Sequence, residues 1–344
     1  MRPIARLFAS SLLLTSLTAT AAQVDRLYEV REPVASQDPA ERAAAMGRAL
    51  QTLAVRLTGN RQAAQAPRLQ PLLADPQQLV QQYVYESGTP VVLDVTFDPV
   101  QSQRVLQDAG LKLWGASRPA VLAWWLNDQD GGATLAVDGQ DGSAALRAAA
   151  QNRGVPLSLP LGDLNEQLLA NPASLRASDL QAVRSASERY AADALLAVVA
   201  RNAGDSWQAD WQLQVGNERV AGSSTAASEA ALADAVMLDV SEKLASRFAS
   251  AAPAQSLTLE VLGSDLSHYA ALERLLEPFA PRLLEISANG RLLFQVNASP
   301  EQLRAQLQLG RLHELPAEAA EGAPVQNPPL QVPAASANRL RFSW

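Results

Sequence analysis

The chain has 344 residues, of which 48% are hydrophobic, and its formal net charge is −7. That length predicts two or three domains, each large enough to bury a core of its own. The acidic charge and the absence of any Lys/Arg run argue against nucleic acid and anionic lipid headgroups as partners. The sequence contains no cysteine, which excludes disulfides, cysteine-ligated zinc and cysteine nucleophiles.

The first residues have the order of a secretory signal peptide. Arg2 and Arg6 supply positive charge, residues 7–17 are mainly apolar, and Ala19-Thr20-Ala21 offers a small-residue cleavage site. The apolar stretch is shorter than the roughly 20 residues that span a bilayer. We therefore expect residues 1–22 to be a cleaved signal peptide and the mature chain to be periplasmic, without a transmembrane segment.

Four segments share a pattern that starts helices. Each has an N-cap oxygen, then proline, then Glu or Gln at the third helical position. The four segments begin at Asp38-Pro39, Asp75-Pro76, Asp98-Pro99 and Ser299-Pro300. We interpret these residues as helix caps, not as carboxylate sites.

Residues 23–113 predict a small α+β domain. The helix that begins at Pro39 has an apolar face at helical spacing and ends near Gly59. Residues 27–31 and 91–97 have the pattern of strands, and the second of these alternates apolar and polar side chains.

Residues 114–250 predict an α/β domain with a mixed sheet, because strand and helix patterns alternate and a hairpin follows. The hairpin turn is expected at Gly216-Asn217. The expected strands are 121–126, 134–137, 195–200, 207–215 and 219–225, and the expected helices are 143–152, 179–190 and 228–248.

Residues 254–315 follow the order β-α-β-β-α with a further strand near Leu312, which predicts a ferredoxin-like domain. Residues 316–344 form a Pro/Ala-rich tail whose last five residues alternate as a short strand. This strand could add to the edge of a partner's sheet. We favour pairing within the chain's own sheet, because an unpaired apolar strand would promote aggregation.

Enzyme motifs do not stand out in this sequence. It has only two histidines, His268 and His313, and no nucleophile elbow, phosphate loop, dinucleotide fingerprint or zinc-helix motif. Aspartates among the glycines of residues 128–142 lack the closing Glu of a calcium loop and fit hairpin turns. We therefore expect no catalytic residues, no metal and no cofactor. A pair of converging carboxylates stays open as an alternative, since the chain has 35 acidic residues.

Tryptophan and arginine gather in the middle domain. Trp124 and Trp125 face opposite sides of a strand, so one would fill a core while the other could reach the surface. An exposed Trp beside Arg is typical of a protein-binding anchor, and stacking on sugar rings or burial in a core are the alternatives. The candidate partner-binding residues are Trp114, Arg118, Trp124 and Trp125, with Phe342 and Trp344 of the last strand.

Short segments spread over most of the chain form a further pattern. They include Tyr28-Glu29-Val30, Tyr83-Val84-Tyr85, Leu113-Trp114-Gly115, Arg118-Pro119 and Arg153-Gly154-Val155-Pro156. Together they resemble the proteobacterial secreted family described as domain of unknown function 2066, which implies a periplasmic protein with no established enzymatic activity. Residues 153–193 and the hairpin after them also resemble the fold of curli-secretion and penicillin-binding-protein-activator lipoproteins, which are envelope assembly and regulation factors.

These observations favour a non-enzymatic periplasmic accessory or scaffold protein of the cell envelope. It would bind a protein partner through the tryptophan–arginine surface or the terminal strand. One alternative is an envelope glycan or peptide hydrolase with paired carboxylates. Another is a module that binds a small ligand or glycan in an apolar pocket.

Overall fold

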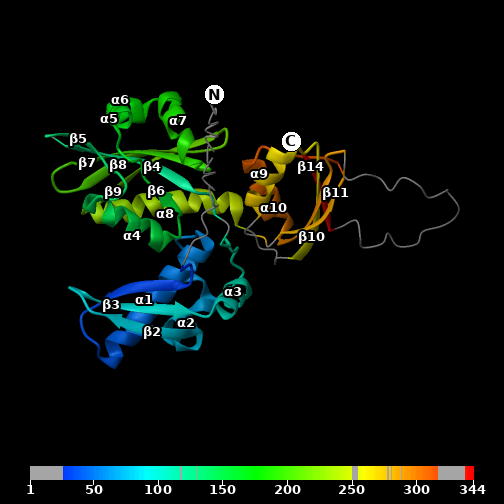
Figure 1. Ribbon diagram of the computed structural model, residues 1–344. Coiled ribbons are helices and arrows are strands. Elements are labelled where there is room, and N and C mark those ends of the chain that lie inside the picture. Colours follow the sequence, from blue (N-terminus) through cyan, green and yellow to red (C-terminus); the bar gives the residue numbers. More distant parts are fainter. Residues whose placement is uncertain are drawn as a thin grey trace, which may run out of the picture.

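The chain folds into three domains, each built around its own sheet, of three, six and five strands (Figure 1). It is therefore a mixed α+β protein, as the sequence predicts. The computed structural model describes residues 26–116, 118–129, 131–249, 255–276, 279, 281–287, 289–316 and 338–344. The expected signal peptide and most of the Pro/Ala-rich tail lie outside these residues. Within them, no helix has the length and apolar character needed to cross a membrane.

The N-terminal domain packs a three-stranded antiparallel sheet against one long helix. Met46, Leu50 and Leu53 of this helix contact Val30 and Phe97 of the sheet in a common core. In chain order the elements are β1 (Glu29–Val34), α1 (Pro39–Thr58), α2 (Gln70–Ala74), β2 (Val80–Glu86), β3 (Val91–Phe97) and α3 (Pro99–Asp108). The strands lie in the order β1-β3-β2.

The helix-start pattern predicts some of the local structure. Asp98 and Ser299 each accept a hydrogen bond from the third N–H of their helix, as expected. Asp38 precedes α1 without such a bond. After Asp75 the chain makes one 3₁₀ turn, Pro76–Leu79, and then enters β2, where we expected a helix. The next residues are rich in Val and Tyr, which favour a strand that can pair with β3.

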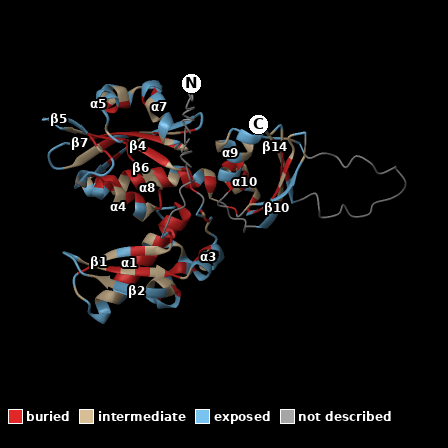
Figure 2. Cartoon of the chain, in the orientation of Figure 1, coloured by how far each residue is buried: buried red, intermediate tan, exposed pale blue. Residues whose placement is uncertain are grey.

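The middle domain has three layers, with helices on both faces of a mixed sheet (Figure 1). Its elements are β4 (Val121–Gln129), β5 (Gly132–Leu135), α4 (Ala144–Arg153), β6 (Leu157–Ser158), α5 (Leu164–Leu169), α6 (Pro172–Arg176), α7 (Gln181–Ser187), β7 (Ala194–Asn202), β8 (Trp207–Val215), β9 (Glu218–Ala226) and α8 (Glu229–Phe248). The strand order is β5-β4-β7-β8-β9, and β6 pairs with β4. Strands β4 and β7 are parallel and buried on both faces, which explains their nearly continuous apolar sequences (Figure 2).

The C-terminal domain packs two helices on one face of a five-stranded sheet. Its elements are β10 (Gln255–Leu262), α9 (Leu266–Leu276), β11 (Arg282–Ile286), β12 (Leu292–Ala298), α10 (Pro300–Leu309), β13 (His313–Glu314) and β14 (Arg339–Ser343). The strand order is β11-β12-β10-β14-β13. The sheet therefore differs from the expected ferredoxin-like one, because the C-terminal strand lies inside it.

The last strand pairs within the chain, which is the arrangement we favoured. Strand β14 runs parallel to β10 and antiparallel to β13. The alternation of apolar and polar side chains places them on opposite faces of the sheet. Leu340 and Phe342 enter the domain core, while Arg339 and Arg341 lie on the other face. There both arginines form ion pairs with Glu260 of β10.

Candidate functional site

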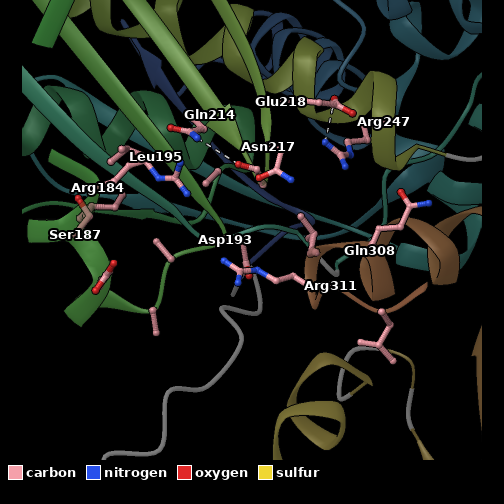
Figure 3. Close-up of a pocket in the computed structure, with 18 of the residues that line it drawn as sticks. Arg184, Ser187, Asp193, Leu195, Gln214, Asn217, Glu218, Arg247, Gln308 and Arg311 are labelled. Atoms are coloured by element: carbon pink, nitrogen blue, oxygen red, sulfur yellow. Dashed lines mark hydrogen bonds and ion pairs between the residues drawn. The ribbon is translucent and has the colours of Figure 1, made fainter. Parts of the chain in front are cut away.

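A cleft of about 810 Å³ lies between the middle and C-terminal domains (Figure 3). Pockets that hold ligands commonly have volumes of roughly 300–1,000 Å³ and often lie between domains. The middle domain contributes the end of α7, the start of β7, the β8–β9 turn and the end of α8. The C-terminal domain contributes the end of α10 and the start of β13. Ala305 and Leu309 of α10 pack against the core of the middle domain and hold the two domains together.

Asp193 is the carboxylate that anchors the middle-domain side of the cleft. It comes just before β7, and its Oδ2 accepts a hydrogen bond from the N–H of Ala120 at 2.8 Å. The carbonyl of Ala120 in turn accepts bonds from the N–H groups of Asp193 and Ala194. Burial raises the pKa of Asp193 above the ordinary aspartate value. Asp193 therefore joins the starts of β4 and β7 and also lines the cleft (Figure 3).

Three arginines line the cleft, and they differ in their partners. Arg247 of α8 forms an ion pair with Glu218 at 3.1 Å. Arg184 of α7 and Arg311 after α10 form no side-chain hydrogen bond or ion pair with any residue that the structure describes. In Figure 3, Arg311 extends from the C-terminal domain toward the region of Asp193. Two guanidinium groups without a partner among the described residues, one from each domain, thus line the same cavity.

Two residues of the cleft have a left-handed backbone that glycine normally adopts. Ala191 has φ 49° and Arg311 has φ 63°. In the described part of the chain, only Arg26 and Leu180 are further non-glycine residues with positive φ. Such conformations cost roughly 1–3 kcal/mol each and concentrate at functional sites. Arg311 follows the C-terminus of α10, where glycine is the usual residue.

Uncharged polar groups complete the lining. Ser187, Gln214, Asn217 and Gln308 all face the cleft. Ser187 also accepts a hydrogen bond from the indole N–H of Trp124 at 3.0 Å, which fixes its position. The amides of Asn217 and Gln308 come from different domains, and each can both donate and accept hydrogen bonds.

The middle-domain candidates named from the sequence lie elsewhere and do not form a surface. Trp114, Arg118, Trp124 and Trp125 expose 1%, 3%, 0% and 2% of their surface. Trp124 and Trp125 do face opposite sides of β4, but helices cover both faces of the sheet. The indole N–H of Trp125 donates to Asn127 at 2.9 Å. Neither tryptophan reaches solvent, because the third layer of the domain buries the face that we expected to be open.

Arg118 joins the N-terminal and middle domains. Its guanidinium stacks on the ring of Trp114 at 4.1 Å and donates five hydrogen bonds, all to backbone carbonyls. The acceptors are the carbonyls of Gly115, Arg153, Gly154, Arg56 and Trp114, at 2.7–3.3 Å. Five is the full number of N–H donors that arginine has.

Arg56 is a second buried guanidinium beside Arg118. It donates to the carbonyls of Asn152 at 3.1 Å and Leu27 at 3.1 Å, among others. The two arginines thus supply donors to the C-terminal ends of α1 and α4, where helix carbonyls lack partners and the helix dipole is negative. Burial, with the neighbouring positive charge, lowers the pKa of Arg118 to about 9 and that of Arg56 to about 10. Both residues hold the domains together and do not offer a partner-binding surface.

The terminal-strand candidates also have internal roles. Phe342 is fully buried in the C-terminal core. Trp344 is half-buried and stacks on His268, with ring centroids 4.4 Å apart. His313, the other histidine, lines the cleft. Within the described residues, no three His, Asp or Glu side chains are grouped so as to hold a metal ion.

The residues that line the cleft were missed at the sequence level. Arg184 and Asp193 lie more than 100 positions before Arg311, and none of the three belongs to a local motif. One local signal concerns Arg311. It directly follows Gly310, the C-cap of α10, at a position after the helix where glycine is usual. Gly310 itself packs against Leu275, so that a Cβ there would collide with this side chain.

Residues 21–115 match a family model described as "Domain of unknown function (DUF8605)". The match covers the N-terminal domain and ends at Gly115, just before Arg118. No curated protein and no solved structure matches the chain. The resemblance to domain of unknown function 2066 is therefore wrong, since a different model matches and covers only the N-terminal domain. The likeness of the middle region to curli-secretion and penicillin-binding-protein-activator lipoproteins has no supporting match and falls with it.

Proposed function

We propose that this chain is a non-enzymatic accessory or scaffold protein of the cell envelope that holds a short segment of a protein partner between its middle and C-terminal domains. The observation that carries this proposal is the cleft of about 810 Å³ that both domains line. The side chains of Arg184 and Arg311, which bond to no residue in the described part of the chain, and the strained backbone of Ala191 and Arg311 support a binding role.

The polar lining suits a peptide. An extended peptide exposes both N–H and C=O groups, so side chains that donate and accept can follow its backbone. Asn217 and Gln308 provide such amides from the two domains. A segment that bonds to both would be held across the domain boundary.

The buried ionisable groups support a non-enzymatic reading, because each has a structural partner. Perturbed groups can mark a catalytic site. Here Arg56 and Arg118 cap helix ends, and Asp193 is bonded to Ala120. The buried carboxylate of Glu166 accepts hydrogen bonds from Tyr190 and from backbone N–H groups at the start of α5.

We also propose that the protein works in the periplasm. The support is the order of positive, apolar and small residues over residues 1–22.

Site-specific photo-crosslinking in the native cell tests the proposed function. A photoreactive amino acid would replace Asn217 or Gln308 in the cleft, and the matched control position is Gln107, exposed on α3. We expect both cleft positions to label the same segment of one envelope protein, mapped by mass spectrometry, and Gln107 to leave that segment unlabelled. If neither cleft position labels a partner, or if Gln107 labels the same segment equally, the cleft is not the binding site.

A further inference from the structure

We infer that the segment held in the cleft is acidic, and that one of its carboxylates lies between Arg184 of the middle domain and Arg311 of the C-terminal domain. This inference rests on the proposed function and names the chemistry of the ligand. A guanidinium binds a carboxylate through paired, charge-assisted N–H···O bonds, which give orientation as well as affinity. Both guanidinium groups have their donors available to a ligand, since neither bonds to a residue that the structure describes.

The contrast with the other arginines of the cleft and the domain junction supports this assignment. Arg247 is neutralised by Glu218, and Arg118 uses all five donors on carbonyls. Arg184 is half-buried against the cleft wall, so its position is restricted although no partner holds it.

The acids of the cleft do not neutralise these two arginines. Glu188 is exposed and forms no ion pair with a described residue, and Glu218 already pairs with Arg247. Asp193 accepts a hydrogen bond from the N–H of Ala120 and forms no ion pair with a residue that the structure describes. A carboxylate from a ligand would therefore find positive charge that the surrounding side chains leave uncompensated.

The backbone of Arg311 is a second, independent observation. An arginine with φ 63° is less favourable than glycine, which occupies this conformation freely. In Figure 3 the side chain of Arg311 extends into the cleft. Arg311→Gly therefore removes the guanidinium and the strain together, so the variant should fold at least as well as the parent chain.

The test uses two capped peptides of matched size on the full chain. Acetylated, amidated triglutamate carries three carboxylates, and triglutamine replaces them with neutral amides. We expect triglutamate to bind at least tenfold more tightly in a heteronuclear NMR titration. Arg184→Ala and Arg311→Gly should each weaken triglutamate binding at least tenfold, and Arg311→Gly should keep or raise the melting temperature. Arg282→Ala, an exposed arginine of β11 that lines neither cavity wall, is the matched control and should change the affinity less than twofold.

Inorganic phosphate serves as the second anionic probe, because a phosphate group could use the same two guanidinium groups. The carboxylate assignment requires triglutamate to displace phosphate from the cleft. If phosphate binds more tightly than triglutamate, the ligand is a phosphate compound and the inference of an acidic peptide is overturned.

The remaining outcomes separate the inference from the proposed function. Equal binding of triglutamate and triglutamine would overturn the acidic ligand while leaving the cleft as a peptide site. Triglutamate binding that Arg184→Ala and Arg311→Gly leave unchanged would overturn the assignment of both arginines. The photo-crosslinks from Asn217 and Gln308 do not depend on ligand charge, so they decide the proposed function by themselves.

Discussion

Replacement of Arg118 by alanine should weaken the coupling between the N-terminal and middle domains, so that the two domains unfold separately. The five hydrogen bonds of Arg118 run to carbonyls of both domains and of the segment between them. Arg118→Ala removes these donors from carbonyls at the ends of α1 and α4 and in the segment between the two domains. Hydrogen bonds from a charged donor contribute roughly 1.5–3 kcal/mol each, or about 7–15 kcal/mol for the five.

The cost of burying the charge offsets part of this sum. Burial and the neighbouring Arg56 lower the pKa of Arg118 to about 9, and this lowering corresponds to roughly 5 kcal/mol against the charged form. Some carbonyls will also find water once the side chain is gone. We therefore expect Arg118→Ala to lower the free energy of unfolding by about 3–5 kcal/mol, as is typical when one member of a buried charged network is removed.

Urea unfolding of the full chain, followed by circular dichroism and tryptophan fluorescence, measures this loss. The parent chain should unfold its first two domains in one transition, and Arg118→Ala should split that transition in two. Arg118→Lys keeps the charge but has only three donors, so its loss should be intermediate. The exposed Arg282→Ala should stay within about 0.5 kcal/mol of the parent. A loss below about 1 kcal/mol for Arg118→Ala would refute the role given to these carbonyl bonds.

Two further predictions concern the domain junction and the last strand. Gly154→Ala should lower the free energy of unfolding in urea by about 2–4 kcal/mol, because Gly154 has φ 63° and an added Cβ would collide with the Arg118 guanidinium. The control is Gly139→Ala, at a turn residue with open space around it. A loss for Gly154→Ala no larger than that of the control would contradict this packing. Burial alone would raise the pKa of Glu260, but Arg291, Arg339 and Arg341 lower it below the ordinary 4.5. Its contribution is therefore complete above pH 4.5 and is lost as the pH falls through the lower folded-state pKa. The protection factors of the β14 amides, taken against the intrinsic exchange rate at each pH, should fall over that acidic range. In Glu260→Gln they should be low already at neutral pH. Protection factors that neither change affects would contradict the docking role of Glu260.

Local sequence patterns correctly predicted those elements whose secondary structure does not depend on packing against the rest of the chain. Strand β3 alternates over residues 91–97, and the structure has it at those bounds. The turn at Gly216-Asn217 joins β8 and β9 as expected, since two turn residues between alternating segments specify a hairpin. Helix α8 follows from one apolar stripe and its cap Ser228.

Features that depend on a third layer of the domain or on distant segments of the chain could not be predicted from local sequence patterns. The alternation at Trp124 and Trp125 gives opposite faces correctly, but only the helices packed on each face decide that both are buried. The alternation of the last strand predicts one apolar face. It does not predict that this strand lies between β10 and β13, because that position depends on where these two strands lie in the sheet. The carbonyls around Arg118 come from residues up to 62 positions away in the sequence.

The arginines show why burial and charge alone do not identify a binding site. Arg118 has the residue type, the aromatic neighbour and the strongly lowered pKa that suggest a functional group. Its donors are nevertheless all used within the fold, so it has none left for a partner. The side chains of Arg184 and Arg311 bond to no residue that the structure describes, so their donors remain available in a cavity. The use of hydrogen-bond donors therefore separates the two pairs. Replacing Arg56 or Arg118, whose donors are used within the fold, should lower stability. Replacing Arg184 or Arg311, whose side chains bond to no described residue, should weaken binding without lowering stability.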